Sequence, residues 1–219
     1  MPPLRLTKEL YFITTTVIDW MDVFTRPAYK HIVIDSLRYC QEHKGLQIYA
    51  WVLMTNHLHL IASAGLQIQH YGNDGILPSE SAGLQIQHKG GNGIQHNGDN
   101  GIQPNSILVG DIMRDFKKFT GKGIVKAIQD HPQESRKEWL LDRCWFRGNN
   151  DSKVTQYKFW QDGYYTETIT SYDIYRQKLD YIHNNSVRQE IVQRPEEYLY
   201  SSARDYCGGK GLLEVIVLP

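Results

Sequence analysis

The chain has 219 residues, 41% of them apolar, which is enough for one hydrophobic core and too few to require two. Its 24 basic and 24 acidic residues cancel, so any surface that binds nucleic acid has to be local. Three cysteines far apart in the chain suggest neither a disulfide framework nor a thiolate zinc site, and no stretch approaches the roughly 18 apolar residues of a membrane span. We therefore expect a cytoplasmic protein that does not contact a membrane.

The first part of the chain predicts a strand, a helix and a hairpin. Residues 10–18, LYFITTTVI, are rich in the β-branched and aromatic side chains typical of strands. Pro27 and Gly45 bound a helix over residues 26–44. Residues 47–54 and 57–62 are two apolar strands, and the Thr55-Asn56 pair between them is short enough for a hairpin.

A segment from about Ser63 to Asn105 has a composition unlike the rest of the chain. SAGLQIQH occurs at residues 63–70 and again at residues 81–88, and NGIQ recurs at positions 92 and 100. Its Gly, Asn and Gln residues bury too little apolar surface to offset the entropy lost on ordering. We expect a low-complexity insertion in one domain that spans residues 1–219. The alternative is a binding or metal-binding stretch that uses His70, His88 and His96, although no partner ligands accompany them.

The segment after the insertion predicts a helix over residues 107–128 with two distinct sides. Its inward side should consist of Ile112, Met113, Phe116 and Phe119. The opposite side forms one continuous basic face, here called the basic face, made of Arg114, Lys117, Lys118 and Lys122. These cations are either an ordinary solvated surface or, next to a DNA site, a track for phosphates.

The last strand of the sheet has two candidates, Cys144–Arg147 and Gly163–Ile169. Phe159, Trp160 and Tyr165 are expected in the core, unless one of them is exposed and stacks on an unpaired base.

Ser171 is a good N-cap for a final helix that runs to about Asn185, and a short helical tail is expected over residues 198–206. The order strand, helix, strand, strand, helix, strand indicates an α+β protein with a ferredoxin-like split βαβ core. In that core an antiparallel sheet carries helices on one face.

His57 and His59 are the first residues that suggest chemistry. They lie two apart in a strand, so both imidazoles point to the same face of the sheet while Leu58 packs on the other. Two neutral imidazoles can hold a divalent cation, and a third ligand from another element would leave positions open for a phosphate. Taken alone, such a pair can also arise by chance or serve only in hydrogen bonding.

The chain resembles the REP-associated tyrosine transposases and the related insertion-sequence-200-like HUH transposases in four strings. These strings are VLMTNHLHLI, DIMRDFKKFTGK, FWQDGYYTETI and KLDYIHNNSVRQEIVQRPEEYLYSSARDY, and they occur in the expected order. With the opening strand they cover most of the chain outside the insertion and residues 130–154.

This resemblance implies a ferredoxin-like nuclease whose final helix carries a nucleophilic tyrosine. Tyr181 stands at that position, His57 and His59 would bind the metal, and Asn185 stands where relatives place a further ligand. Positions i and i+4 share a helix face, so Tyr181 and Asn185 should lie together, with Lys178 on the same strip. Without the resemblance, Tyr181 would have no better claim than another of the 14 tyrosines, such as Tyr165.

The implied activity is cleavage and strand transfer of single-stranded, hairpin-containing DNA through a phosphotyrosine, with Mg or Mn as cofactor, by a monomer or a homodimer. Thr55 and Ser186 stand where the family usually has proline, but neither change removes a reacting group. Two other functions remain open. One is a domesticated DNA-binding protein that no longer cleaves, and the other is a phosphoesterase in which the metal activates water.

Overall fold

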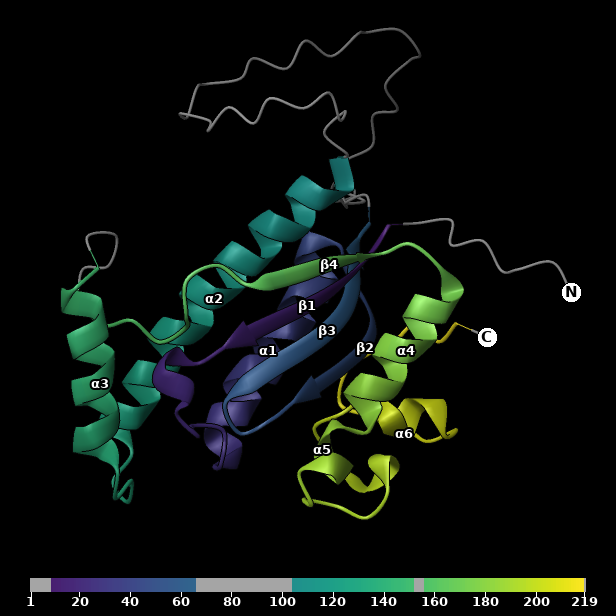
Figure 1. Cartoon of the computed structure of the whole chain (residues 1–219). Helices are drawn as coiled ribbons and strands as arrows, with labels where there is room; N and C mark the ends of the chain where they lie inside the picture. The colour runs from purple at the N-terminus through teal and green to yellow at the C-terminus, as the bar shows by residue number, and fades with distance from the viewer. Residues whose placement is uncertain (1–8, 66–103, 152–155, 219) are drawn as a thin grey trace, which may run out of the picture.

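A computed structural model describes residues 9–65, 104–151 and 156–218 (Figure 1). Most of the expected insertion, including His70, His88 and His96, lies outside the described residues. The third strand continues to Ala64, so Ser63 belongs to the sheet and the insertion begins later in the chain than expected.

The centre of the fold is a four-stranded antiparallel sheet with the order β2-β3-β1-β4. Its strands are β1 (Leu10–Thr16), β2 (Leu46–Leu53), β3 (His57–Ala64) and β4 (Tyr165–Ile169). The two central strands are β1 and β3, and their register places Thr14 opposite His59. β3 is buried along its whole length, because helices cover both faces of the sheet.

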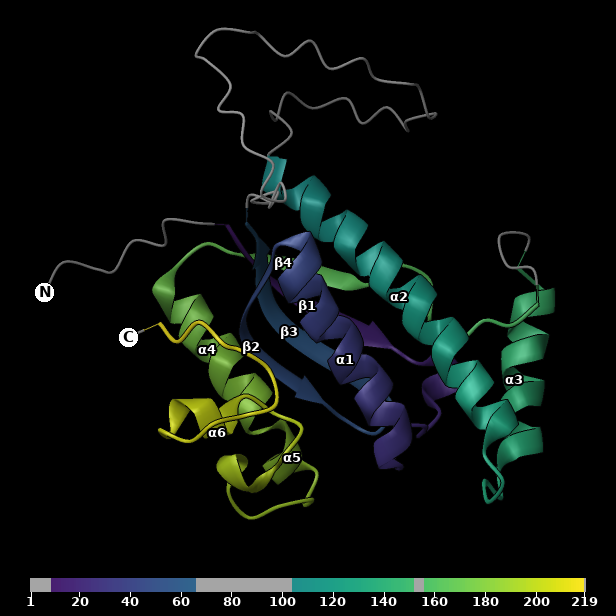
Figure 2. The same cartoon turned by 180° about the vertical axis from the view of Figure 1, so that it is seen from behind.

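Two long helices, α1 (Pro27–Lys44) and α2 (Pro104–Asp130), cover one face of the sheet, as Figure 2 shows. Gly45 ends α1 in the left-handed region, at φ 70°, where glycine carries no steric penalty. Buried side chains such as Val33, Leu37, Met113 and Ile124 form the core between these helices and the sheet. This is the ferredoxin-like α+β fold that the sequence predicts.

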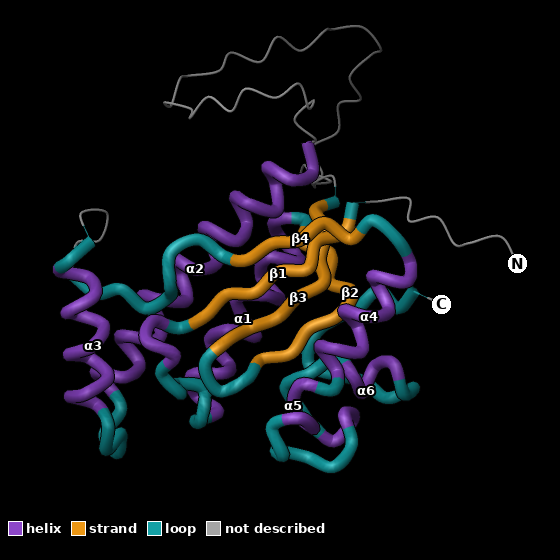
Figure 3. The backbone as a smooth tube through the Cα atoms, viewed as in Figure 1, coloured by secondary structure: helices purple, strands orange, loops and turns teal. Residues whose placement is uncertain are grey.

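The remaining elements lie at one end and on the other face of the sheet (Figures 1 and 3). A 3-10 helix, η1 (Ile18–Trp20), follows β1, and α3 (Lys137–Asn149) lies next to it. On the opposite face α4 (Tyr172–His183) packs against part of the sheet, mainly β2 and β3, and is followed by α5 (Asn185–Arg188), η2 (Pro195–Glu197) and α6 (Ala203–Tyr206). None of the helices in the described parts is long and apolar enough to cross a membrane.

Several sequence-based expectations on element boundaries are wrong. Cys144–Arg147 lies in α3, where Leu140, Cys144 and Gly148 are buried at a spacing of four residues, which is a helical rather than a strand period. The last strand is therefore the other candidate. The C-terminal tail is helical only over Ala203–Tyr206. The final helix ends at His183, two residues earlier than expected.

Two aromatic side chains that were expected to be buried are exposed. Phe119 is 69% exposed because α2 packs inward through Met113 and Phe116 and turns Phe119 away from the sheet. Tyr165 is 58% exposed because β4 is an edge strand and only its last residue, Ile169, is buried. Phe159 and Trp160 are buried, as predicted.

A buried carboxylate joins the start of α1 to the link between α2 and α3. Glu134 accepts hydrogen bonds from Arg26 Nε at 2.6 Å, from the Tyr29 hydroxyl at 3.2 Å and from the Arg136 backbone at 3.2 Å. Burial alone raises the pKa of the Glu134 carboxyl. The hydrogen bonds and the arginine charges outweigh burial and lower this pKa to about 2.

Replacing Glu134 by Gln is expected to lower the free energy of unfolding by about 2 kcal/mol near neutral pH, because two arginines lose a buried charged partner. The lowered pKa stabilises the fold above the unfolded-state pKa, and this contribution disappears as the pH falls toward the folded-state pKa of about 2. Urea unfolding at several pH values measures both effects. The exposed Glu138→Gln is the control, and an equal loss in both variants would contradict the role given to Glu134.

Candidate active site

The two histidines of β3 lie on the face of the sheet that α4 covers. His57 and His59 are 8% and 5% exposed, and their ring centroids are 4.7 Å apart. Leu58, between them, is fully buried. The predicted same-face arrangement of the pair follows directly from the alternation of the strand.

Each imidazole is oriented by one side-chain oxygen. Nδ1 of His57 lies 2.7 Å from Asn56 Oδ1, and Nδ1 of His59 lies 2.7 Å from Thr14 Oγ1. An amide oxygen only accepts, so Nδ1 of His57 carries the proton and Nε2 keeps its lone pair. The Thr14 hydroxyl can either donate to or accept from Nδ1 of His59, so this contact orients the ring, and where Thr14 accepts, the lone pair of His59 is on Nε2. Metal-binding histidines have this arrangement, in which the second ring nitrogen is held by an oxygen.

Both rings are neutral at physiological pH. Burial lowers the pKa of His57 to about 4. Burial, together with the neighbouring His57 and the positive charge of Lys178, lowers the pKa of His59 to about 3. Neutral imidazoles present lone pairs, so the two rings are ready to act as ligands without first losing a proton.

Tyr181 on α4 lies against the histidine pair. Ser171 caps this helix, and its hydroxyl accepts a hydrogen bond from the Ile174 backbone, as predicted for an N-cap. The Tyr181 hydroxyl is 3.5 Å from Nε2 of His59, and the two ring centroids are 5.2 Å apart. Tyr181 is 38% exposed, so its oxygen can be reached from solvent.

Phe12 of β1 positions both of these groups. Its ring stacks on His59 with centroids 5.4 Å apart and meets the edge of Tyr181 at 5.9 Å. One fixed aromatic side chain therefore sets the separation of the tyrosine and the histidine.

Asn185 is buried at the start of α5, but it does not lie on the same continuous helix as Tyr181. The interruption lies at Asn184, whose backbone N–H and side-chain amide both donate to the Asp180 carbonyl, at 3.0 Å and 2.9 Å. The i, i+4 argument that placed Tyr181 and Asn185 on one strip therefore does not hold in the predicted form. The Asn185 side chain makes no hydrogen bond with any described residue.

The described residues hold no group of three or more His, Cys, Asp or Glu side chains suited to a metal ion. His57 and His59 fit a divalent cation by their tautomer, neutrality and spacing. Any third protein ligand in this part of the chain would be an amide or a hydroxyl oxygen, and the buried Asn185 carries such an atom.

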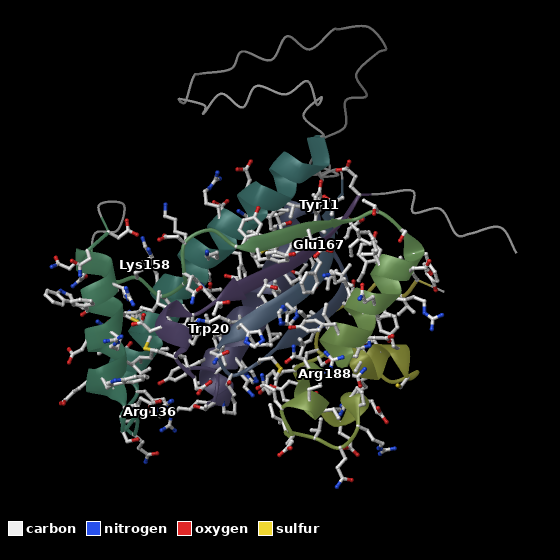
Figure 4. The ribbon with its side chains drawn as sticks, in the orientation of Figure 1. Tyr11, Trp20, Arg136, Lys158, Glu167 and Arg188 are labelled. Carbon is white, nitrogen blue, oxygen red and sulfur yellow. The ribbon has the colours of Figure 1, made fainter. Side chains whose placement is uncertain are left out.

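Two cations lie beside Tyr181. The Arg188 guanidinium is 5.5 Å from the centre of the Tyr181 ring and makes no ion pair with any described residue. Lys178 Nζ pairs with Glu167 at 2.7 Å and lies 4.7 Å over the Phe12 ring. Figure 4 labels Glu167 on β4 and Arg188 near α5.

Sequence reasoning missed Thr14, Asn56 and Arg188. The only local signal for Arg188 is its place two helical turns after Tyr181. The sequence carries no local signal that Thr14 contacts His59, because the contact depends on strand register.

The basic face does not lie beside the histidines, because α2 is on the opposite side of the sheet (Figure 2). Lys117 turns toward the carbonyls of Gln161 and Gly163, and burial lowers its pKa to about 8. Arg114 pairs with Asp111 and Asp115. Lys118 and Lys122 line a groove between α1 and α2. The structure therefore divides these four cations among three environments, and their role in DNA binding stays a prediction.

Comparison with known proteins gives little further information. No protein-family model matches the chain, and no curated protein matches it. Among solved structures, a REP-associated tyrosine transposase bound to a REP hairpin is similar over 100% of this chain and 92% of that chain, with 14% identity and a TM-score of 0.47. A likeness at this level assigns neither a family nor a function.

The lowered pKa values predict how the two rings titrate. In the folded protein without metal, NMR signals of His57 and His59 should stay those of neutral imidazole down to about pH 5. In the unfolded chain the two histidines take up protons near pH 6.5. The free energy of unfolding therefore has its full value, as far as these histidines are concerned, above that pH, and it falls as the pH drops toward about 4. Asparagine substitutions at each position assign the signals. A ring that titrates near pH 6.5 would contradict the burial argument.

Proposed function

We propose that this protein cuts single-stranded DNA and rejoins it through a covalent phosphotyrosine at Tyr181. One observation carries the proposal, the 3.5 Å approach of the Tyr181 hydroxyl to Nε2 of His59. This approach brings Tyr181, the nucleophile that the resemblance implies, against the histidine pair, although 122 residues separate it from His59 in sequence. Proximity of an accessible nucleophile to a group that can bind metal is the arrangement that phosphoryl transfer requires.

His57 and His59 would hold a divalent cation, Mg or Mn, through their Nε2 atoms, with Asn185 as the proposed third ligand. Once bound, such a cation polarises the scissile phosphate and stabilises negative charge on its oxygens. Asn56 keeps His57 in the tautomer that exposes Nε2, and Thr14 would do the same for His59 by accepting from its Nδ1.

In the proposed cleavage step the Tyr181 oxygen forms a bond to phosphorus as the bond to the 3′ oxygen of the preceding nucleotide breaks. The products are a 5′ phosphotyrosine and a free 3′ hydroxyl, and the one proton that the phenol loses balances the one that the leaving 3′ oxygen gains. Arg188 brings a positive charge next to the phenol ring, where it can pair with the phosphate. The tyrosine–phosphate bond keeps the energy of the cleaved bond, so a 3′ hydroxyl can reverse the step without ATP.

The two rival functions use the same face of the sheet with different chemistry. A DNA-binding protein that no longer cleaves would have no need of a tyrosine beside two oriented imidazoles. A phosphoesterase would use water in place of the phenol and would turn over without a covalent product. The near contact of Tyr181 with His59 favours the tyrosine mechanism over both.

Replacing Tyr181 by Phe should abolish a covalent protein–DNA adduct, because only the reacting oxygen is removed. The measurement uses labelled single-stranded DNAs with varied hairpins, Mn or EDTA, and a denaturing gel. Tyr165→Phe is the matched control, since Tyr165 is also exposed and also touches the Phe12 ring, at 6.3 Å. The adduct should require Mn and survive in the control.

Other outcomes of this assay assign the function differently. Cleavage without an adduct would point to attack by water. An adduct that persists in Tyr181→Phe and disappears in Tyr165→Phe would move the nucleophile to β4. Binding without cleavage over the whole hairpin set would identify the domesticated DNA-binding protein.

Replacing Thr14 by Val should weaken Mn binding by about 10-fold to 100-fold, because His59 loses the oxygen that orients its ring. Isothermal titration with Mn alone measures this effect. Thr16→Val is the control, since Thr16 lies on the same side of β1 and its hydroxyl bonds to neither histidine. Equal losses in the two variants, or none in Thr14→Val, would rule out the orienting role.

A further inference from the structure

An exposed tryptophan stands next to the histidine pair. Trp20, at the end of η1, is 61% exposed, although a ring of this size is usually at least half covered. Its ring centroid is 6.2 Å from that of His57, with an angle of 68° between the ring planes. Figure 4 shows Trp20 where η1 meets the sheet, on the side that carries α4.

The backbone that presents Trp20 is strained. Asp19 and Trp20 have φ values of 52° and 55°, in the left-handed region that favours glycine. Such a conformation costs about 1–3 kcal/mol per residue and persists only where the surroundings impose it. Backbone strain of this kind is common at functional sites, and here it lies at an exposed aromatic residue.

Two sets of contacts impose this conformation. The Asp19 carboxylate pairs with Arg143 at 2.7 Å and accepts from Arg147 Nε at 2.8 Å, which ties η1 to α3. These arginines, with the hydrogen bond from Arg147 the largest contribution, hold the pKa of Asp19 below its usual value, so the carboxylate stays charged. The Trp20 carbonyl accepts from Asn56 Nδ2 at 3.1 Å.

Asn56 also orients the candidate metal ligand. Its Oδ1 accepts from His57 Nδ1 at 2.7 Å while its Nδ2 donates to Trp20 and to Asp22. One amide side chain therefore fixes the imidazole and the backbone of the tryptophan together. Asn56, in the turn between β2 and β3, therefore fixes the position of Trp20 relative to the histidines.

We propose that Trp20 is a stacking platform for an unpaired base of a DNA strand whose phosphate lies at His57 and His59. The inference rests on the proposed function for its substrate class and adds a binding site to it. A π face stacks on any base, so it holds a single strand without reading its sequence. The two ring centroids are 6.2 Å apart, so one strand can contact both Trp20 and the histidine pair.

The charges around the site favour a nucleic acid over an apolar protein partner. Arg188 lies on the same side of the histidine pair as Tyr181 and suits a phosphate. An apolar partner would have to cover that exposed cation together with Trp20. A strand of DNA instead supplies a flat apolar base for the ring and an anion for the guanidinium.

The test separates base stacking from phosphate binding. Two labelled strands of about 15 nucleotides are used, one oligothymidine and one with abasic sugars and the same phosphates. Binding is measured by fluorescence anisotropy in EDTA, in the Tyr181→Phe background, so that neither metal nor cleavage contributes. The main variant is Trp20→Gly, because glycine accepts a φ of 55° without strain and only the ring is lost.

Trp20→Gly should bind oligothymidine about 10-fold more weakly, while its affinity for the abasic strand stays within about twofold. Trp20→Tyr, which keeps a ring, should recover most of the difference. Trp139→Gly is the control, since Trp139 on α3 is 51% exposed and should leave both affinities unchanged. Circular dichroism and thermal unfolding check that each variant is folded.

The proposal is overturned if the Tyr181→Phe chain with Trp20 intact binds both strands equally, if Trp20→Gly weakens both equally or neither, or if Trp139→Gly gives the same loss. These results are independent of the adduct assay. A chain that forms no adduct and still loses base-dependent binding in Trp20→Gly would keep the platform and lose the cleavage mechanism. An adduct without a Trp20 effect would do the reverse.

Discussion

The antiparallel register between β1 and β3 is the constraint on which the candidate site depends. It places Thr14 opposite His59 and sets both histidines on the face that α4 covers. A slip of one residue would turn the imidazoles toward α1 and α2 and put Leu58 in their place. That slip is prevented by the buried side chains on the other face of β3, so the hydrophobic core also fixes the geometry of the site.

Burial keeps both histidines neutral, and the same burial has a free-energy cost because it removes polar ring nitrogens from water. Each ring is kept neutral with a pKa far below that of a free imidazole, and each polar Nδ1 is satisfied by an oxygen from a neighbouring residue. Tyr181 differs in being more than one-third exposed. The site thus combines two fixed, buried imidazoles with one accessible side chain, and the Phe12 ring contacts both His59 and Tyr181.

The sequence predicted what depends on local spacing. The alternation of β3, the Pro27 and Gly45 limits of α1 and the Ser171 cap of α4 are short-range properties, and each is confirmed. The contacts of Thr14 and the side of the sheet that α2 covers depend on pairing between distant segments. The break at Asn184, between α4 and α5, is not revealed by helix propensity. The basic face was misplaced relative to the histidines for the same reason, because helical spacing says nothing about which side of the sheet a helix covers.

Thr55 and Ser186, the two positions at which the sequence departs from the transposases that it resembles, have local surroundings that account for them. The Thr55 hydroxyl donates to Asp22 at 2.6 Å, and Asp22 also accepts from Asn56, so a side-chain bond holds the turn that a proline would stiffen. Ser186 is fully buried, and its hydroxyl has no partner among the described residues, which is the environment of a position suited to an apolar ring such as proline. The hydrogen bond from Thr55 to Asp22 therefore helps to hold Asn56, and Asn56 in turn holds His57 and the backbone of Trp20.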